Sequence, residues 1–295
     1  MKKIFMTGAT GFVGTLVAQE LVANGYQVSG LARSDRSAAK LQKMGVKPVA
    51  GSLSDLEVLK SAAQDADAVI HLGFNNDFRH FYRAGNQDVA AIKALGQGVQ
   101  GTTKPLIVTD GTSGARRRVL TEQVQLSAIG GLMPRRSEYT ARKLIGQGIN
   151  AFVVRLSPAV HGKGDHGFTK MLIDAAKENK AAKYLRLGNH NWSAVHQIDA
   201  AHLYVLAVQY GLRTSQPSLR IFNAAGEASV SQAAIARAIA TKLNVPVKPT
   251  ANLFGLGNLA VLNLLNCPAD SSATQKVLDW HPSQAGLCAD IMEEY

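Results

Sequence analysis

The chain has few cysteines and no long apolar run, and both absences exclude classes of protein. Cys267 and Cys288 are the only cysteines among 295 residues, which excludes a disulfide framework and a cysteine-based metal centre, and no metal site is predicted. No apolar stretch approaches the roughly 18 residues that a membrane-spanning helix needs. The N-terminus enters an apolar strand directly and lacks the features of a signal peptide, so we expect a cytoplasmic protein without a membrane partner.

Carboxylates are few relative to cations. Lys and Arg number 32 against 21 Asp and Glu, which gives a formal net charge of +11. The densest basic cluster, residues 116–118 with Arg135 and Arg136, contains no aromatic residue, whereas base-stacking surfaces need aromatics. We therefore expect a solvated basic loop and no nucleic-acid partner, and attraction of an anionic cofactor is sufficient use for the remaining charge.

The N-terminal segment has the order of elements that a dinucleotide-binding unit needs. Residues 4–6 have the composition of a short buried strand and are followed by the glycine-rich stretch TGATGFVG at 7–14. Residues 15–24 have the apolar spacing of a helix, and residues 28–31 that of a second strand. This strand, glycine turn, helix and strand predict a nucleotide-binding site at the turn.

Each glycine of this stretch has its own physical role. Gly8 allows the tight turn after the strand, Gly11 lets the backbone approach a pyrophosphate, and Gly14 lets the helix pack closely on the sheet. Unpaired amides at the helix N-terminus would bind the phosphates, because the helix dipole favours negative charge there.

The end of the second strand predicts the cofactor preference. The residues there are Arg33, Ser34, Asp35 and Arg36, so a cation comes first and the acid follows two places later. Arg33 would pair with a 2′-phosphate, with Ser34 close by, which favours NADP(H). The alternative is a solvated basic loop in which Asp35 reaches the ribose of NAD(H).

Further apolar runs predict a parallel sheet buried on both faces. Runs at 48–53, 68–74, 105–109 and 151–156 alternate with helical patterns, which indicates an α/β protein with a doubly wound Rossmann sheet. His71, inside one of these runs, is interpreted as a structural residue.

Neither a repeat nor a low-complexity linker separates the parts of the chain. We expect a dinucleotide-binding domain at 1–158 and a smaller, interleaved substrate-binding part at 159–295, with a strand at 219–225 rejoining the sheet.

Three stretches resemble a known family. TGATGFVG at 7–14, HQIDAA at 196–201 and WHP at 280–282 resemble motifs of the extended and atypical short-chain dehydrogenase/reductases, also described as the NAD-dependent epimerase/dehydratase family. The resemblance implies NAD(P)-linked oxidoreduction of a small carbonyl or alcohol substrate, and a homodimer as the default assembly. Together with the strand-end positions it predicts cofactor contacts at Gly8, Thr10, Gly11, Phe12, Val13, Gly14, Arg33, Ser34, Ser52, Leu53, Gly73, Phe74, Thr109, Pro158 and Val160.

The same resemblance suggests catalytic residues. Tyr139 and Lys143 match the Tyr-x-x-x-Lys signature, in which Lys lowers the pKa of the Tyr that exchanges the proton, and the i, i+4 spacing puts both on one helix face. Thr112, or Ser113, would hold the substrate oxygen at the end of the fifth strand. His161 is either an alternative proton donor or a residue that hydrogen-bonds its own loop.

The position of the Tyr and Lys leaves an alternative open. Gly148 follows Lys143 by only five positions, whereas a helix returning along the sheet takes about a dozen residues, so Tyr139 would fall low on that helix. If Glu138 is the acid that follows the signature in the family, the catalytic positions fall at Gly130 and Pro134, and the pair is absent. A non-catalytic NADP sensor similar to NmrA-like proteins, or a nucleotide-sugar epimerase or dehydratase, are the alternative functions.

Overall fold

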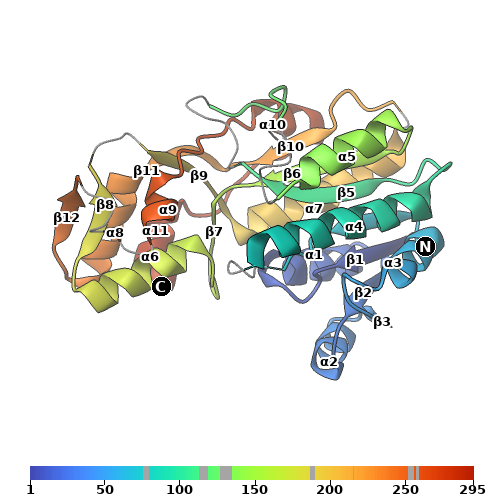
Figure 1. The fold of residues 1–295 in the computed structure, drawn as a ribbon, viewed down its shortest axis with the longest axis horizontal. Helices are drawn as coiled ribbons and strands as arrows, with labels where there is room; N and C mark the ends of the chain where they lie inside the picture. The colour runs from blue at the N-terminus through green and yellow to red at the C-terminus, as the bar shows by residue number, and fades with distance from the viewer. Residues whose placement is uncertain are drawn as a thin grey trace.

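Seven parallel strands form the central sheet, in the order β10-β6-β5-β4-β1-β2-β3 (Figure 1). The structure is a computed structural model that describes residues 1–75, 80–112, 119–126, 135–186, 190–214, 216–251, 256 and 259–295. The strands of this sheet are β1 (Lys3–Thr7), β2 (Gln27–Ala32), β3 (Lys47–Ala50), β4 (Ala68–His71), β5 (Leu106–Gly111), β6 (Ala151–Leu156) and β10 (Ile221–Ala224). This is the doubly wound Rossmann sheet that the sequence predicts, and the predicted fold class is confirmed.

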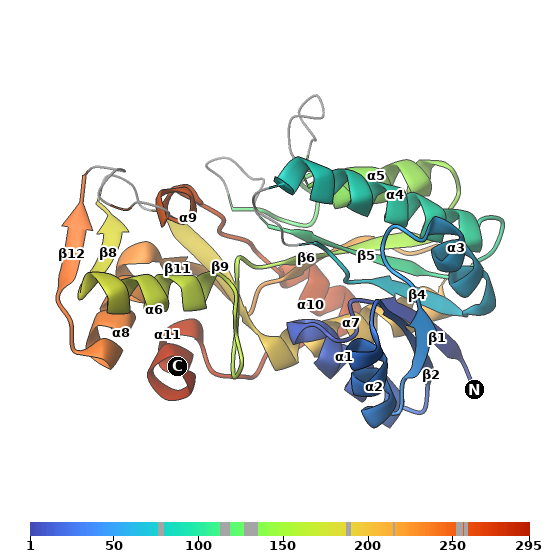
Figure 2. The ribbon, with the colours of Figure 1, turned by 60° about the horizontal axis from the view of Figure 1, so that its bottom comes forward.

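Helices cover both faces of the sheet (Figure 2). One face carries α1 (Phe12–Ala23), α2 (Asp35–Lys43), α7 (Gln197–Arg213) and α10 (Ser272–Leu278). The other face carries α3 (Leu56–Asp65), α4 (Phe81–Val99) and α5 (Ser137–Gly146). In the part of the chain that the structure describes, every helix is too short or too polar to span a membrane.

The continuous apolar runs of the strands are explained by these two helical layers. Along β1, Ile4 and Met6 point into one hydrophobic cluster while Phe5 points into the other. Along β5, Ile107 and Val108 divide in the same way, because successive strand side chains point to opposite faces. Each strand residue therefore removes apolar surface from water, which is the main stabilising term of the fold.

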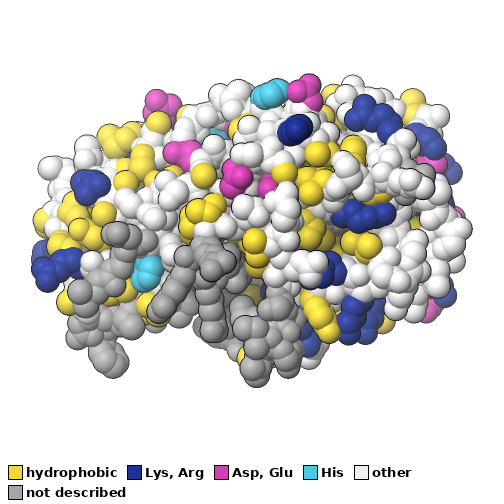
Figure 3. Space-filling view, turned by 90° about the horizontal axis from the view of Figure 1, so that it is seen from above, with side chains coloured by type: hydrophobic (Ala, Val, Ile, Leu, Met, Phe, Trp, Pro, Cys, Tyr) yellow, Lys and Arg dark blue, Asp and Glu magenta, His cyan; other side chains and the backbone are white. Residues whose placement is uncertain are grey.

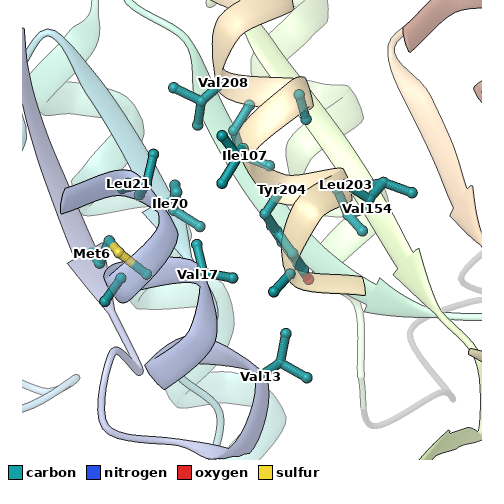
Figure 4. Packing of buried hydrophobic residues seen from close by; sticks show 14 of the residues in the cluster. Met6, Val13, Val17, Leu21, Ile70, Ile107, Val154, Leu203, Tyr204 and Val208 are labelled. Carbon is teal, nitrogen blue, oxygen red and sulfur yellow. The ribbon is translucent and has the colours of Figure 1, made fainter. Parts of the chain in front are cut away.

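The first cluster joins α1 to α7, which lies much later in the chain (Figure 4). Val17 and Leu21 of α1 are buried in the same cluster as Leu203, Tyr204 and Val208 of α7. The glycine turn that precedes α1 is thus held by packing from a distant segment.

The remaining elements form a smaller part beside the sheet (Figure 1). A three-stranded sheet and a two-stranded sheet pack with four helices around Trp192. These elements are β7 (Ala159–His161), α6 (Phe168–Asn179), β8 (Ala182–Leu185), β9 (Asn191–His196), β11 (Glu227–Ser231), α8 (Gln232–Leu243), β12 (Val247–Thr250), α9 (Ala260–Leu264) and α11 (Leu287–Glu294).

The chain crosses between the two parts more than once. After β9, α7 returns to the central sheet, and β10 pairs in parallel with β6, so that Phe222 lies opposite Val154. The domain boundaries proposed from the sequence remain a prediction.

A buried ion pair connects α5 to the sheet. Arg155 of β6 is fully buried, and its Nε and Nη2 atoms donate to Glu138 at 2.6 and 2.8 Å. The same guanidinium donates to the carbonyl oxygens of Thr121 and Val124, and the Glu138 carboxylate accepts from the amide of Leu126. The pair therefore joins α5, β6 and residues 120–126.

We expect Glu138→Gln to lower the free energy of unfolding by about 3–5 kcal/mol, because it leaves the buried Arg155 charge without its counter-ion. Urea denaturation measures the change. Glu178→Gln, at an exposed position near the end of α6, is the matched control and should change stability by less than about 0.5 kcal/mol. Equal stability of the two variants would contradict the structural role of the pair.

Candidate functional site: a glycine turn at the carboxyl ends of the strands

The glycine turn between β1 and α1 leaves the first amides of the helix without a side-chain cap. Gly8 has φ +73°, and the amide of Gly11 donates to the Gly8 carbonyl oxygen at 2.9 Å. Gly11 is the N-cap of α1, and no side chain there accepts from the first turn, which also contains no acid. Such a helix N-terminus is suited to bind a phosphate group.

Backbone segments approach so closely here that no side chain fits between them. A Cβ on Gly14 would lie 2.1 Å from the Gly8 carbonyl oxygen, and a Cβ on Gly8 would lie 2.7 Å from the amide nitrogen of Gly73. At Gly73 itself, a Cβ would lie 2.9 Å from Thr7 Oγ1. The turn, the first turn of α1 and the chain after β4 form a cradle that even a methyl group would fill.

A chain of buried hydrogen bonds lies beneath this cradle. The Gly73 amide donates to Thr7 Oγ1 at 3.0 Å, and Thr7 Oγ1 lies 2.8 Å from His71 Nδ1. His71 Nε2 lies 3.1 Å from Asp88 Oδ1, and the Ser137 hydroxyl donates to Asp88 Oδ2 at 2.7 Å. With a neutral imidazole, Nε2–H donates to the carboxylate and Nδ1 accepts from Thr7. Both ring nitrogens are used within the core, in agreement with the structural role predicted for His71.

Cations surround the end of β2. Arg33 and Arg36 are exposed there, and Lys40 Nζ donates to the carbonyl oxygen of Thr10 at 2.8 Å. Ser34 is the N-cap of α2 and forms a capping box with Ser37, so its hydroxyl is already engaged. Sequence reasoning missed Lys40, although its position one helical turn after Arg36 puts the two cations on one face of α2.

The turn after β3 contains a carboxylate that the sequence reasoning did not expect. Asp55 Oδ2 accepts from the amide and the hydroxyl of Ser52, at 2.6 and 2.8 Å, and these hydrogen bonds lower the pKa of Asp55. Leu53 borders the cradle, because its Cδ2 atom lies 3.2 Å from the position of a Cβ on Gly73. Asp55 therefore places a carboxylate beside Ser52, a residue predicted to contact the cofactor.

The hydroxyl groups predicted at the end of β5 are enclosed. Thr109 Oγ1 lies 2.8 Å from the hydroxyl of Tyr204 in α7, and Thr112 Oγ1 lies 3.2 Å from Ser193 Oγ in β9. Thr112 is fully buried. Its contact with a substrate oxygen stays a prediction, and Ser113 lies outside the described residues.

Arg135, which the sequence analysis assigns to a solvated basic loop, packs beside the end of β5. Its guanidinium lies 4.4 Å from the ring centre of Phe74 and donates to the Thr109 carbonyl oxygen at 3.0 Å. Its Nε atom donates to Ser137 at 3.2 Å and lies 3.6 Å from Asp110 Oδ1. Because its side chain is only 28% exposed and is extensively paired, the prediction of a solvated basic loop is wrong for Arg135. Residues 116–118 of the same basic cluster lie outside the described residues.

Asp110 at the end of β5 balances that charge. Its carboxylate accepts from the amide of Glu138 at 2.7 Å, which fixes the start of α5 against the sheet. Burial raises the pKa of Asp110, and the neighbouring Arg135 acts in the opposite direction. The structure thus brings a cation and a carboxylate together at the strand ends, where ligands of such sheets bind.

The Tyr139 and Lys143 side chains meet, but on the outer side of α5. Lys143 Nζ lies 4.6 Å from the ring centre of Tyr139, which is 39% exposed, and both line a groove between α4 and α5. None of the predicted cofactor residues lines this groove. The geometry of the helix explains this position. Ser137 and Glu138 face inward to their buried partners, so the next residue, Tyr139, points outward.

The helix differs from the one expected. It is ten residues long and begins at Ser137, so Tyr139 lies in its first turn and not low on a longer helix. Gly130 and Pro134, the alternative catalytic positions, lie outside the described residues.

His161 lies in β7 of the smaller part and not in the loop that the sequence analysis expects. It is 1% exposed, and its Nδ1 atom lies 2.6 Å from Asp290 Oδ2. Of the other residues predicted after β6, Pro158 connects β6 to β7 and Val160 packs against the α1–α7 cluster. The smaller part also reaches the glycine turn, because the His166 ring lies edge-on to Phe12 at 5.7 Å.

Comparison with known proteins agrees with this geometry. Residues 8–127 match a family model described as NAD(P)H-binding. An uncharacterized protein of Saccharomyces cerevisiae is 37% identical over 299 residues, 99% of each chain. A 4-hydroxy-2-methyl-3-oxo-4-farnesyl-3,4-dihydroquinoline-1-oxide ketoreductase of Stigmatella aurantiaca is 26% identical over 71% of this chain and 65% of its own. The structure of dTDP-glucose 4,6-dehydratase from Bacillus anthracis in complex with NAD matches with a TM-score of 0.75 at 14% identity, over 100% of this chain and 95% of the other.

The Rossmann sheet and the glycine cradle define an NAD(P)-binding protein of the oxidoreductase class. The chain belongs to the extended short-chain dehydrogenase/reductases, the NAD-dependent epimerase/dehydratase family, as the sequence motifs predict.

We expect Gly14→Ala to abolish nucleotide binding and to lower the free energy of unfolding by about 1–3 kcal/mol, because the new methyl group overlaps the Gly8 carbonyl oxygen. Gly146→Ala is the matched control, since it has open space and lies at the end of α5. It should leave nucleotide binding intact and stability unchanged or slightly higher. Fluorescence titration with NADPH and urea denaturation measure both effects, and unimpaired NADPH binding by Gly14→Ala would exclude the cradle as the site.

Proposed function

We propose that the protein transfers a hydride between NADP(H) and a small carbonyl or alcohol substrate. The observation that carries this proposal is the uncapped N-terminus of α1 in a cradle formed by Gly8, Gly14 and Gly73. When bound, the nicotinamide cofactor supplies or accepts the hydride, and the protein binds and orients it. The ketoreductase relative supports reduction of a carbonyl group as the chemistry.

The preference for NADP(H) rests on the charges beside β2. Arg33, Arg36 and Lys40 are all exposed. Asp35 lies in the first turn of α2, where the helix dipole stabilises a carboxylate. Guanidinium groups match the geometry of a phosphate better than that of ribose hydroxyls. A 2′-phosphate at this strand end would therefore have three cations to pair with.

Arg135 is our candidate for the group that stabilises the substrate oxygen. Its charge lies at the end of β5, stacked on Phe74 and oriented by Thr109 and Ser137. A fixed cation there would stabilise the negative charge that develops on a carbonyl oxygen as the hydride reaches its carbon. Thr112 stays a candidate ligand of the same oxygen. To bind it, the Thr112 hydroxyl would give up its hydrogen bond with Ser193 and form one with the substrate.

A second candidate function is a non-catalytic NADP sensor. The observation in its favour is the outward position of Tyr139 and Lys143, since a sensor needs the glycine turn but no proton donor. A nucleotide-sugar epimerase or dehydratase is less favoured, because that chemistry needs a working Tyr.

We expect NADPH to bind at least about tenfold more tightly than NADH, a difference of about 1.4 kcal/mol. Arg33→Ala should remove most of this difference by weakening NADPH and leaving NADH unchanged, because only NADPH has the 2′-phosphate. Nicotinamide fluorescence titration of the purified protein measures both affinities, with Lys177→Ala on α6 as a control for the loss of one exposed charge. Equal weakening of both nucleotides in Arg33→Ala would argue against phosphate recognition.

We expect Arg135→Met to lower kcat by about 100-fold or more for any carbonyl substrate that the protein reduces, while the Kd of NADPH stays within about threefold of its original value. Methionine keeps an unbranched apolar side chain beside Phe74 but removes the charge. Arg135→Lys should retain part of the activity. NADPH oxidation over a panel of small aldehydes and ketones measures the rates. NADPH binding without turnover of any substrate would favour the sensor, and full activity of Arg135→Met would exclude the role of Arg135.

A further inference from the structure

We propose that Tyr295 and Asp165 hold residues 162–167 against the glycine turn, and that this contact sets how long a bound dinucleotide stays on the protein. Residues 162–167, called the 162–167 loop, connect β7 to α6. In both ribbon views the loop lies between α11 and the start of α1 (Figures 1 and 2). The inference rests on the proposed dinucleotide site at the glycine turn, and it makes Tyr295 and Asp165 positioning residues of that site.

The 162–167 loop reaches the glycine turn through an aromatic contact. The His166 ring lies edge-on to Phe12, with the ring centres 5.7 Å apart and the ring planes at 75°. Phe12 directly follows Gly11, the N-cap of α1, so the contact lies beside the amides that would bind the phosphates. A dinucleotide in the cradle would therefore be bordered by the 162–167 loop.

Asp165 anchors this loop to Tyr295. The buried Asp165 carboxylate accepts from the Tyr295 hydroxyl through Oδ2 and from the amide of Gly167 through Oδ1, both at 2.6 Å. Burial raises the pKa of Tyr295, so its hydroxyl keeps the proton that it donates. Hydrogen bonds to a carboxylate are stronger than those between neutral groups, so this anchor fixes the middle of the loop.

The support for the anchor is α11, which also holds the residue before the loop. The Nδ1 atom of His161 lies 2.6 Å from Asp290 Oδ2 in α11. Leu287 and Ile291 of the same helix are fully buried in the core of the smaller part. Tyr295 directly follows α11, so its position is set by that core.

The contact with the turn depends on the Asp165 anchor more than on the start of the loop. Gln197 of α7 donates to the carbonyl oxygen of Lys163 at 2.9 Å, which holds the loop before Asp165. His166 follows Asp165 and is exposed. An edge-on ring contact is weak by itself, so His166 stays against Phe12 only while Asp165 is fixed.

The opposite face of the molecule is a less favourable path for a leaving dinucleotide. The 162–167 loop points downward in Figure 1, and Figure 3 shows the face seen from above, with Asp and Glu side chains near its middle. These carboxylates would repel the negative charge of a dinucleotide. Release past the 162–167 loop avoids them.

Stopped-flow displacement of bound NADPH by excess NADP⁺ tests the proposal. We expect Tyr295→Phe to raise the dissociation rate by about tenfold and to leave the association rate within about threefold, because contacts that hold a bound ligand act mainly on its release. NADH should be released faster by the same factor, since the contact lies at the glycine turn and not at the end of β2. Tyr210→Phe is the matched control, because the Tyr210 hydroxyl is hydrogen-bonded to Ser218 on a different helix, and its release rate should not change.

Variants of His166 test whether the anchor acts through the ring contact. His166→Ala should raise the dissociation rate as Tyr295→Phe does, and His166→Phe, which keeps a ring beside Phe12, should restore the original rate. The double variant Tyr295→Phe, His166→Ala should release NADPH no faster than either single variant, because both changes remove the same contact. Unrelated structural damage at two separate positions would instead combine additively.

Three results would overturn the proposal while leaving the proposed function intact. They are an unchanged dissociation rate in Tyr295→Phe, a roughly hundredfold increase in the double variant, which would mean independent effects, and equal rates for His166→Phe and His166→Ala. The last result would mean that His166 contacts the nucleotide through its polar atoms. Failure of the unmodified protein to bind NADPH or NADH would overturn the proposed function and, with it, this inference.

Discussion

The close approach of three backbone segments at Gly8, Gly14 and Gly73 is the constraint on which the site depends. No Cβ fits at these positions, so the first turn of α1 can stand directly over the strand ends with its amides free. The hydrogen-bond chain from Gly73 through Thr7 to His71 fixes the distance between β1 and β4 beneath the turn. The phosphate-binding geometry is therefore a consequence of packing around glycine and not of any charged side chain.

The same buried chain connects the cradle to the proposed substrate region. Asp88 of α4 joins His71 to Ser137, and Ser137 in turn accepts from Arg135. Positions on β1, β4, α4 and α5 are thereby fixed relative to one another. Since Ser137 and Glu138 must face inward to satisfy buried partners, α5 cannot also present Tyr139 to the sheet. Successive helix residues are about 100° apart, so two neighbours can share the buried face while the third points away from it, and the buried partners of Ser137 and Glu138 decide which two these are.

Much of the fold was predictable because its signals are local. Apolar runs such as 151–156 predict buried strands, and the spacing of Gly8, Gly11 and Gly14 predicts the turn. The end of β4 was less predictable: the apolar pattern continues through Phe74, but the strand ends at His71, and the Gly73 amide donates to the side chain of Thr7 and not to the backbone of the neighbouring strand β1. Within the site, Lys40 had a helical spacing that pointed to it, whereas Arg135 had no local signal and was grouped with its arginine neighbours.

The sequence by itself determined the parallel sheet, the glycine turn and the family, because strand burial and the conformational freedom of glycine depend on a few neighbouring residues. Only the tertiary structure decided which polar side chains meet. Arg135 contacts Phe74 and Thr109, and Glu138 contacts Arg155, across gaps of 17 or more positions in the chain. The i, i+4 spacing puts Tyr139 and Lys143 on one face of a helix, but it does not say whether that face points to the sheet or to solvent. The face is decided by which neighbouring side chains are buried, and that is a property of the folded chain.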